Sequence, residues 1–351
     1  MALPDLSSPH SHRGRTTQKV MLWVAFATLP GIAAQTYFFG PGVIFNLLLA
    51  VAGCVGFEAL AMALRQRPIL FYLRDYSALV TGLLLGLCLP PWSPWWLVVS
   101  GSFFAIILAK QLYGGMGFNP FNPAMVGYVI LLISFPVEMT RWAAPAGLPE
   151  AAAAPGFAEA MNQVWRGLVV DGYTAATPLD LMKQNTSLLL QDLYQQQPVF
   201  AAGQWAGAGW EWINTGFLLG GCLLLYKRII SWHAPVSMLA SLALMAALFH
   251  DGGSSQSQGS VVFHLLSGAT MLGAFFIITD PVSSAVSNRG RIIFGAATGV
   301  LVFVIRSWGN YPDAIAFAVL LLNFAAPFID YYTVPRTYGH TRSRPATRKD
   351  D

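Results

Sequence analysis

Charged side chains are scarce in this sequence. Only 10% of its 351 residues are Asp, Glu, Lys or Arg, whereas 55% are hydrophobic. A soluble domain carries roughly 25% charged residues, because its surface must face water. The composition therefore excludes a soluble fold, a disordered chain and a disulfide-rich secreted module. It indicates an all-α polytopic membrane protein in contact with lipid.

The sequence also lacks the patterns that bind several redox and nucleotide groups. Cys54, Cys88 and Cys222 lie singly in apolar runs, so the chain alone cannot supply four thiolates to an iron–sulfur cluster. We interpret all three as small buried hydrophobes. There is no glycine-rich nucleotide-phosphate loop. The net charge is only +4 and no basic stripe is interleaved with aromatics, so nucleic acid is not an expected partner.

Apolar runs recur along the chain and predict about ten transmembrane helices. A straight crossing of the bilayer needs about 20 residues, and several runs are shorter than that. The two shortest, 77–90 and 123–137, lie close to glycine and proline, which is typical of broken helices around an internal site. The runs are approximately 20–40, 42–63, 77–90, 95–112, 123–137, 212–230, 235–250, 261–279, 292–308 and 313–331.

The basic residues predict which helix ends face the cytoplasm. If the N-terminus is cytoplasmic and the chain changes side at every run, all but four of the 20 Lys and Arg residues lie inside. The four outside are Arg141, Arg166, Lys183 and Arg306. This positive-inside bias predicts that both termini are cytoplasmic.

One long connection divides the spans into two groups of five. The predicted organisation is a cytoplasmic tail (1–19), a first five-helix repeat (20–137), a periplasmic loop (138–211), a second five-helix repeat (212–331) and a basic cytoplasmic tail (332–351). Gly-containing segments at 113–120 and 308–313 are weakly similar and each precedes an apolar run. Five spans per half would give inverted repeats, which place a site near the middle of the membrane.

The outside loop contains a threonine among small residues, within the segment Asp171-Gly172-Tyr173-Thr174-Ala175-Ala176-Thr177-Pro178-Leu179-Asp180. One interpretation is a plain turn, because Asp-Gly bends a chain and Pro178 keeps Thr177 extended. The other is a modification site, because a hydroxyl between small residues is accessible to another enzyme. Composition alone leaves both interpretations open.

Seven separate segments resemble those of one family of membrane proteins. That family includes the D subunit of the Rnf/Rsx electron-transport complex and, more distantly, the B subunit of the sodium-translocating NADH:quinone reductase. The resemblance covers nearly the whole chain. Its segments are Ser8–His10, Leu29–Gln35, Ala109–Gly115, Asn119–Met125, His264–Phe276, Thr279–Val282 and Asn288–Arg291.

The resemblance implies a membrane flavoprotein that forms part of an ion-translocating oxidoreductase in the bacterial inner membrane. In this family an Ala-Thr-Pro-Leu segment carries FMN, joined through its phosphate to the threonine hydroxyl. The matching residue is Thr177, and Asp171 occupies the acidic position six residues before it. The protein would relay electrons coupled to Na⁺ or H⁺ transport. It would have no complete activity alone.

The resemblance also implies partners. These are the other members of the Rnf/Rsx complex (A, B, C, E and G), above all the periplasmic, flavin-carrying G subunit, and a flavin transferase that attaches the FMN. Because this chain lacks a phosphate loop, NADH is expected to bind elsewhere. A second, noncovalent flavin stays open at this point.

Thr270 is a rival attachment residue. Its segment, Ser267-Gly268-Ala269-Thr270, matches the sequence of the flavinylation motif of related flavoproteins more closely than the segment around Thr177 does. Two observations favour Thr177. His264 stands where the motif has its acid, and Thr270 lies inside an apolar run that a soluble transferase could hardly reach. His264, Ser267 and Thr270 are therefore interpreted as a close helix contact or as part of a noncovalent flavin pocket.

Two Asn-Pro steps, at Asn119 and Asn122, prevent a regular helix and leave backbone polar groups free. They predict either a tight cytoplasmic turn or a broken-helix element that lines a flavin or ion site, because exposed backbone inside a membrane must line a cavity or be buried in protein.

Ionisable residues in or beside the apolar runs are candidates for an ion path. A charge at the bilayer centre costs at least about 2.5–3.5 kcal/mol, so deep charges are usually functional. The candidates are Glu58, Asp280 and Asp313, of which Glu58 is the deepest; interfacial or structural roles are the alternative. Lys110 and Arg306 also lie near span ends. A different class of function, a small-solute channel or secondary transporter without flavin, fits an inverted repeat equally well.

Overall fold

The computed structural model describes residues 16–148, 157–166, 174–185, 188–251, 258–311 and 313–333. Regular secondary structure in these residues is helical, with one isolated β-bridge between Ala143 and Thr174. The expected all-α membrane architecture is confirmed at this level. Asp171 and parts of both predicted tails lie outside the described residues.

The first half of the chain begins with two helices that meet at Thr28. Its hydroxyl donates to the carbonyl of Ala25, and Pro30 lacks the N–H that would continue the hydrogen-bond ladder, so the helix is interrupted there. The elements are α1 (Thr17–Ala27), α2 (Leu29–Phe39), α3 (Gly42–Leu64), α4 (Ile69–Leu73), α5 (Ser77–Cys88), α6 (Trp95–Phe103), the π-helix η1 (Phe104–Gln111) and α7 (Pro123–Ser134).

Short helices lie between the halves, and longer ones follow. The connecting helices are α8 (Pro136–Met139), α9 (Phe157–Arg166), α10 (Pro178–Gln184), α11 (Leu190–Gln196) and α12 (Pro198–Ala201). The second half contains α13 (Trp210–Tyr226), α14 (His233–Leu248), α15 (Val261–Leu266), α16 (Thr270–Leu272), the π-helix η2 (Gly273–Ile277), α17 (Asn288–Trp308) and α18 (Ile315–Thr333).

Four helical stretches in the described residues are long and apolar enough to cross a membrane: Thr17–Phe39, α3, α17 and α18. The helices α5, α7 and α14 are apolar but shorter. The run 261–279, expected as one span, is instead divided at Ser267–Ala269, because Gly268 adopts a positive φ of 57° that ends α15. The count of ten spans and their orientation stay predictions.

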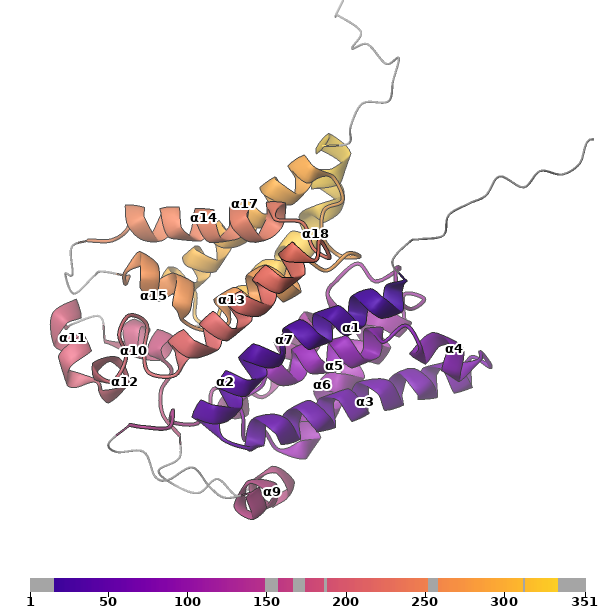
Figure 1. Cartoon of the computed structure of the whole chain (residues 1–351), viewed down its shortest axis with the longest axis horizontal. Coiled ribbons are helices and arrows are strands. Elements are labelled where there is room, and N and C mark those ends of the chain that lie inside the picture. Colours follow the sequence, from indigo (N-terminus) through magenta and orange to yellow (C-terminus); the bar gives the residue numbers. More distant parts are fainter. Residues whose placement is uncertain are drawn as a thin grey trace, which may run out of the picture.

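Figure 1 shows the two halves as neighbouring helix groups, indigo to purple and orange to yellow, with α10, α11 and α12 at one end. The first turn of α1 and the last turn of α18 lie at the other end (Figure 1). Within the halves, α3 packs on α5 and α6, and α14 packs on α15 and α17. The halves meet where α2 contacts α13 and α7 contacts α18.

Candidate functional site

Thr177 occupies the N-cap of α10. Its Oγ1 accepts a hydrogen bond from the Asp180 amide at 3.2 Å, and it donates to Asp180 Oδ2 at 2.6 Å. The Thr177 amide donates to the same carboxylate oxygen at 3.3 Å, which completes a capping box. Pro178 follows at the first helical position, where its fixed φ suits the start of a helix. The sequence Thr-Pro-Leu-Asp therefore both starts the helix and fixes the hydroxyl.

Contacts on either side hold this segment against the helix bundle. The Ala175 amide donates to the carbonyl of Trp142 at 3.0 Å, and Lys183 Nζ donates to the carbonyl of Gly309 after α17. Partial burial lowers the pKa of Lys183, and the nearby Asp180 carboxylate acts in the opposite direction. A small apolar cluster anchors α10, α11 and α12 to α15; its members are Leu179, Leu193, Phe200, Ala206 and Phe263.

Thr177 lies on the wall of a cavity, here called the Thr177 pocket. It has about 770 Å³ of free space, counted out to its open side. Three aromatic rings form one wall: the Phe39 ring centroid lies 5.8 Å from Trp142 and 5.3 Å from Trp210, and the two tryptophans are 5.1 Å apart. The other lining residues are Gln35, Leu87, Cys88, Tyr128, Leu132, Met139, Thr140, Leu179, Asp180, Ile213, Phe217, Gly268, Ala269, Leu272, Tyr311 and Asp313.

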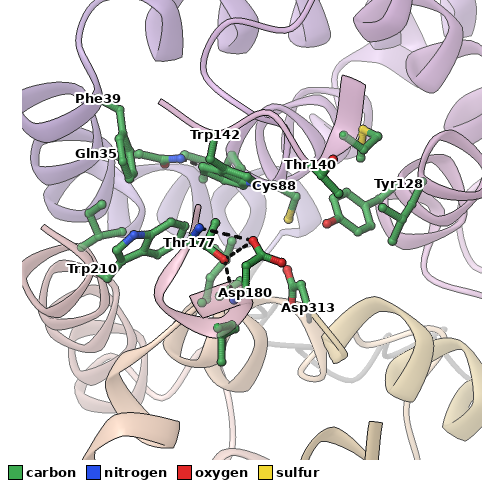
Figure 2. A pocket seen from close by; sticks show the side chains of 18 of the residues that line it. Gln35, Phe39, Cys88, Tyr128, Thr140, Trp142, Thr177, Asp180, Trp210 and Asp313 are labelled. Atoms are coloured by element: carbon green, nitrogen blue, oxygen red, sulfur yellow. Dashed lines mark hydrogen bonds between the residues drawn. The ribbon is translucent and has the colours of Figure 1, made fainter. Parts of the chain in front are cut away.

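Two carboxylates add a polar edge to this otherwise aromatic and aliphatic pocket. Figure 2 shows Asp180 and Asp313 close together beside the Thr177 hydroxyl. Asp313 is held before α18, where its Oδ1 accepts from the Ile315 amide at 3.4 Å. The pocket therefore combines an esterifiable hydroxyl, flat aromatic faces and few polar groups. Those are the features expected of a site for a tethered planar cofactor.

A second cavity, here called the Lys110 pocket, lies between α5, η1, the start of α7 and the end of η2. Asn122 caps α7 by accepting from the Ala124 amide at 3.1 Å, and its Nδ2 donates to the Ile277 carbonyl at 3.4 Å. Asn119 and Asp280 also line this cavity. The Asn-Pro segment therefore lines a cavity, as the broken-helix interpretation expects.

Glu58 and Lys110 form a buried ion pair. Lys110 Nζ lies 2.7 Å from both Glu58 carboxylate oxygens, and the two side chains are only 3% and 2% exposed. Lys110 also donates to Ser77 Oγ at 2.6 Å, and Gln111 Nε2 donates to Glu58 Oε1 at 3.1 Å. Lys110 can be buried because a neighbouring carboxylate pairs with its ammonium.

His264, Ser267 and Thr270 gather around Arg306, which is buried in the protein. Arg306 donates to the His264 carbonyl and to Thr270 Oγ1, both at 2.9 Å, and Thr270 Oγ1 also donates toward the Ser267 carbonyl at 2.8 Å. This hydroxyl is fully buried. The cluster joins the broken end of α15 to α17, which agrees with the helix-contact interpretation.

The predicted site residues thus fall into separate groups. Thr177 and Asp313 share one pocket, and Asn119, Asn122 and Asp280 share the other, beside the ion pair of Glu58. Sequence reasoning missed the pocket walls from α2, α13 and the segment after α8, because no local pattern connects residues so far apart in the chain. Cys222 is exposed, so its interpretation as a buried hydrophobe is wrong; Cys54 and Cys88 are buried.

Comparisons with known proteins identify relatives over almost the entire chain. A model described as the NQR2, RnfD, RnfE family matches residues 6–339. The chain is 64% identical to a protein from Cellvibrio japonicus (strain Ueda107) that is named as the D subunit of an ion-translocating oxidoreductase complex, over 99% of this chain and 98% of that one. A protein of the same name from Ectopseudomonas mendocina (strain ymp) is 57% identical over 97% of each chain. Another, from Pseudomonas aeruginosa (strain UCBPP-PA14), is 51% identical over 100% of each chain.

Proposed function

The chain belongs to the NQR2, RnfD, RnfE family, and from this premise we propose that it is the D subunit of an ion-translocating oxidoreductase complex. Relatives with that name match it over nearly their full lengths. A member of such a complex has the other subunits as partners, and its apolar helices make this one a multi-pass membrane protein.

The Thr177 hydroxyl is the attachment point for covalent FMN in this proposal. The observation that carries it is the placement of this hydroxyl on the wall of an aromatic-lined pocket. Thr174 and Ala176, just before it, are exposed, which gives a transferase access. Thr270, by contrast, is fully buried, and its hydroxyl accepts a hydrogen bond from Arg306. Asp171, the expected acid of the motif, lies outside the described residues.

A bound flavin would accept and donate one or two electrons and so join steps of different stoichiometry. The residues of this chain would position it. The faces of Trp142 and Trp210 offer stacking surfaces, while Leu179 and Phe217 exclude water from the ring. Asp180 must release the Thr177 hydroxyl before that oxygen can carry a phosphate, since its carboxylate would repel the phosphate charge.

The Lys110 pocket is our candidate for a second, noncovalent flavin. Asn119 and Asn122 place amide groups on its wall, and Lys110 lines it as part of the ion pair with Glu58. Phe275 and Phe276 supply apolar wall. This pocket lies at the far end of the fold from α10, so two flavins would stand toward opposite ends of the bundle.

We place the ion path along three carboxylates, of which Glu58 is buried and the other two are half-buried. Glu58 is the first candidate, because it is a buried carboxylate paired with Lys110, and a passing cation could exchange with that ammonium. Asp280 lines the Lys110 pocket and Asp313 lines the Thr177 pocket, so each proposed flavin site has a candidate carboxylate of the ion path. Coupling of electron and ion movement would then be local to each pocket.

An inverted repeat is supported by equivalent contacts in the two halves. Lys110, near the end of η1, donates to Ser77 at the start of α5; Arg306, near the end of α17, donates to Thr270 at the start of α16. Asn122 and Asp313 each accept from an amide two residues later, ahead of α7 and α18. If the two halves arose by duplication and have opposite orientations, each half should contain an equivalent pair of a cation and a hydroxyl.

The alternative, a solute channel or secondary transporter without flavin, gives no reason for a capped threonine inside an aromatic pocket. The names of the relatives also favour the oxidoreductase. Covalent flavin on the purified chain separates the two functions directly.

The test is flavin fluorescence of the chain in a denaturing gel, after expression in a host with a flavin transferase. The wild-type band should fluoresce and its intact mass should rise by one FMN. Thr177→Ala should abolish both signals, and Thr177→Ser should keep part of them because the hydroxyl survives. Thr174→Ala, an exposed threonine three residues away, is the matched control and should keep full signal.

A colourless wild-type band would contradict the proposal and favour the transporter. Equal loss in the Ser and Ala variants would argue against esterification of this hydroxyl. Flavin released on denaturation of Thr177→Ala would report noncovalent binding, separately from the covalent attachment.

A further inference from the structure

A buried glutamine in the Thr177 pocket has an unused hydrogen-bond acceptor. Gln35, on α2, is 3% exposed, and its Nε2 donates to the Leu87 carbonyl at 3.2 Å. Its Oε1 is buried and has no partner among the described residues. Leaving a buried acceptor unpaired is unfavourable, so such atoms usually bind a ligand or a water molecule. Gln35 lines the same cavity as Thr177.

The surroundings of Gln35 suit a flat ring. Phe39 lies one turn further along α2, and Figure 2 shows the Gln35 amide beside Phe39 and Trp142. One N–H of Nε2 is bound to the Leu87 carbonyl, which leaves Oε1 and the second N–H of the amide for a ligand. The unpaired Oε1 suits a ligand with an N–H at the edge of a planar ring.

We propose that Gln35 Oε1 accepts a hydrogen bond from the N3–H of an isoalloxazine ring and so makes the Thr177 pocket specific for flavin. N3–H is the only donor on the pyrimidine edge of the oxidised ring, between two carbonyl oxygens. The proposal rests on the proposed function. The polar edge formed by Asp180 and Asp313 lies beside the Thr177 hydroxyl, where the phosphate would sit, and Gln35 lies away from them (Figure 2).

The test uses a ring-only probe, so that covalent attachment is not needed. In full-length Thr177→Ala protein, the dissociation constants of lumiflavin and 3-methyllumiflavin are measured by fluorescence. Lumiflavin should bind roughly three- to tenfold more tightly, the range for one neutral hydrogen bond. Gln35→Leu should remove this preference. A merely structural effect of Gln35→Leu would weaken both probes alike and leave their ratio unchanged.

Asn46→Leu is the matched control. Asn46 is also a buried amide with an unpaired carbonyl oxygen, and its Nδ2 donates to the Pro90 carbonyl at 2.6 Å, but it does not line the Thr177 pocket. This variant should keep the preference for lumiflavin. A ratio unchanged in Gln35→Leu, or no binding of lumiflavin to Thr177→Ala, overturns the role of Gln35. If the wild-type band is nevertheless fluorescent, the proposed function stands.

Discussion

Two buried cations of this bundle, Lys110 and Arg306, are held by a counter-charge or by hydrogen bonds. Glu58 pairs with Lys110, and Arg306 is surrounded by carbonyls and the Thr270 hydroxyl. Taking one partner away leaves the other charge in an apolar setting, which costs more than the pair contributes when intact. Replacing one member of such a pair should therefore lower the free energy of unfolding more than replacing both members does.

Glu58→Gln should destabilise the chain more than the double variant Glu58→Gln/Lys110→Met. The single change leaves the Lys110 ammonium unpaired and should cost about 3–5 kcal/mol, whereas the double change removes both charges. Thermal unfolding in detergent measures the difference.

In the assembled complex, Glu58→Gln should also lower ion-coupled turnover more than flavin content. Unchanged coupling would leave Glu58 with a structural role only.

At the scale of elements, α14 and α17 approach closely through small residues. Gly295 and Gly299 on α17 face Ser237 and Ser241 on α14, and both pairs are spaced four residues apart. A Cβ at Gly299 would collide with Ser241 Oγ and with the Met238 carbonyl. Close backbone approach is the main source of helix association inside a membrane, so these glycines hold the second half together.

Gly299→Ala should lower the unfolding temperature in detergent. The added methyl group forces α14 and α17 apart, and overpacking of this kind costs about 1–3 kcal/mol. Gly56→Ala in α3 is the control, since a Cβ there meets nothing within 4 Å. It should leave stability unchanged or slightly higher, because alanine favours a helix over glycine. Equal effects of the two substitutions would refute the close contact.

Element boundaries show where sequence reasoning succeeds and where it stops. Apolar runs located α3, α17 and α18, because a long uninterrupted run has few alternatives in a membrane protein. Hydropathy could not locate the break in the run 261–279. It does not register the positive φ of Gly268, nor that Arg306 and Leu179 pack where a Cβ would lie.

For the molecule as a whole, the sequence predicted an attachment residue but not its pocket. Thr177 stood out by its local pattern. Gln35, Trp142 and Trp210 carry no such pattern, because they come together only when α2, α13 and the segment after α8 pack around α10. Likewise Lys110 was recognisable as a charge near an apolar run, but its partner Glu58 is 52 residues away.

The orientation of the whole molecule follows from the charge bias and can be tested in cells. The helix cluster α10–α12 should be periplasmic, and the connection before α17 should be cytoplasmic. In a Cys222→Ser background, where Cys54 and Cys88 are buried, exposed positions are replaced one at a time. A membrane-impermeant maleimide should label Gln195→Cys in intact cells, and Val286→Cys only after lysis. The reverse pattern would put Thr177 on the cytoplasmic face and contradict the predicted orientation.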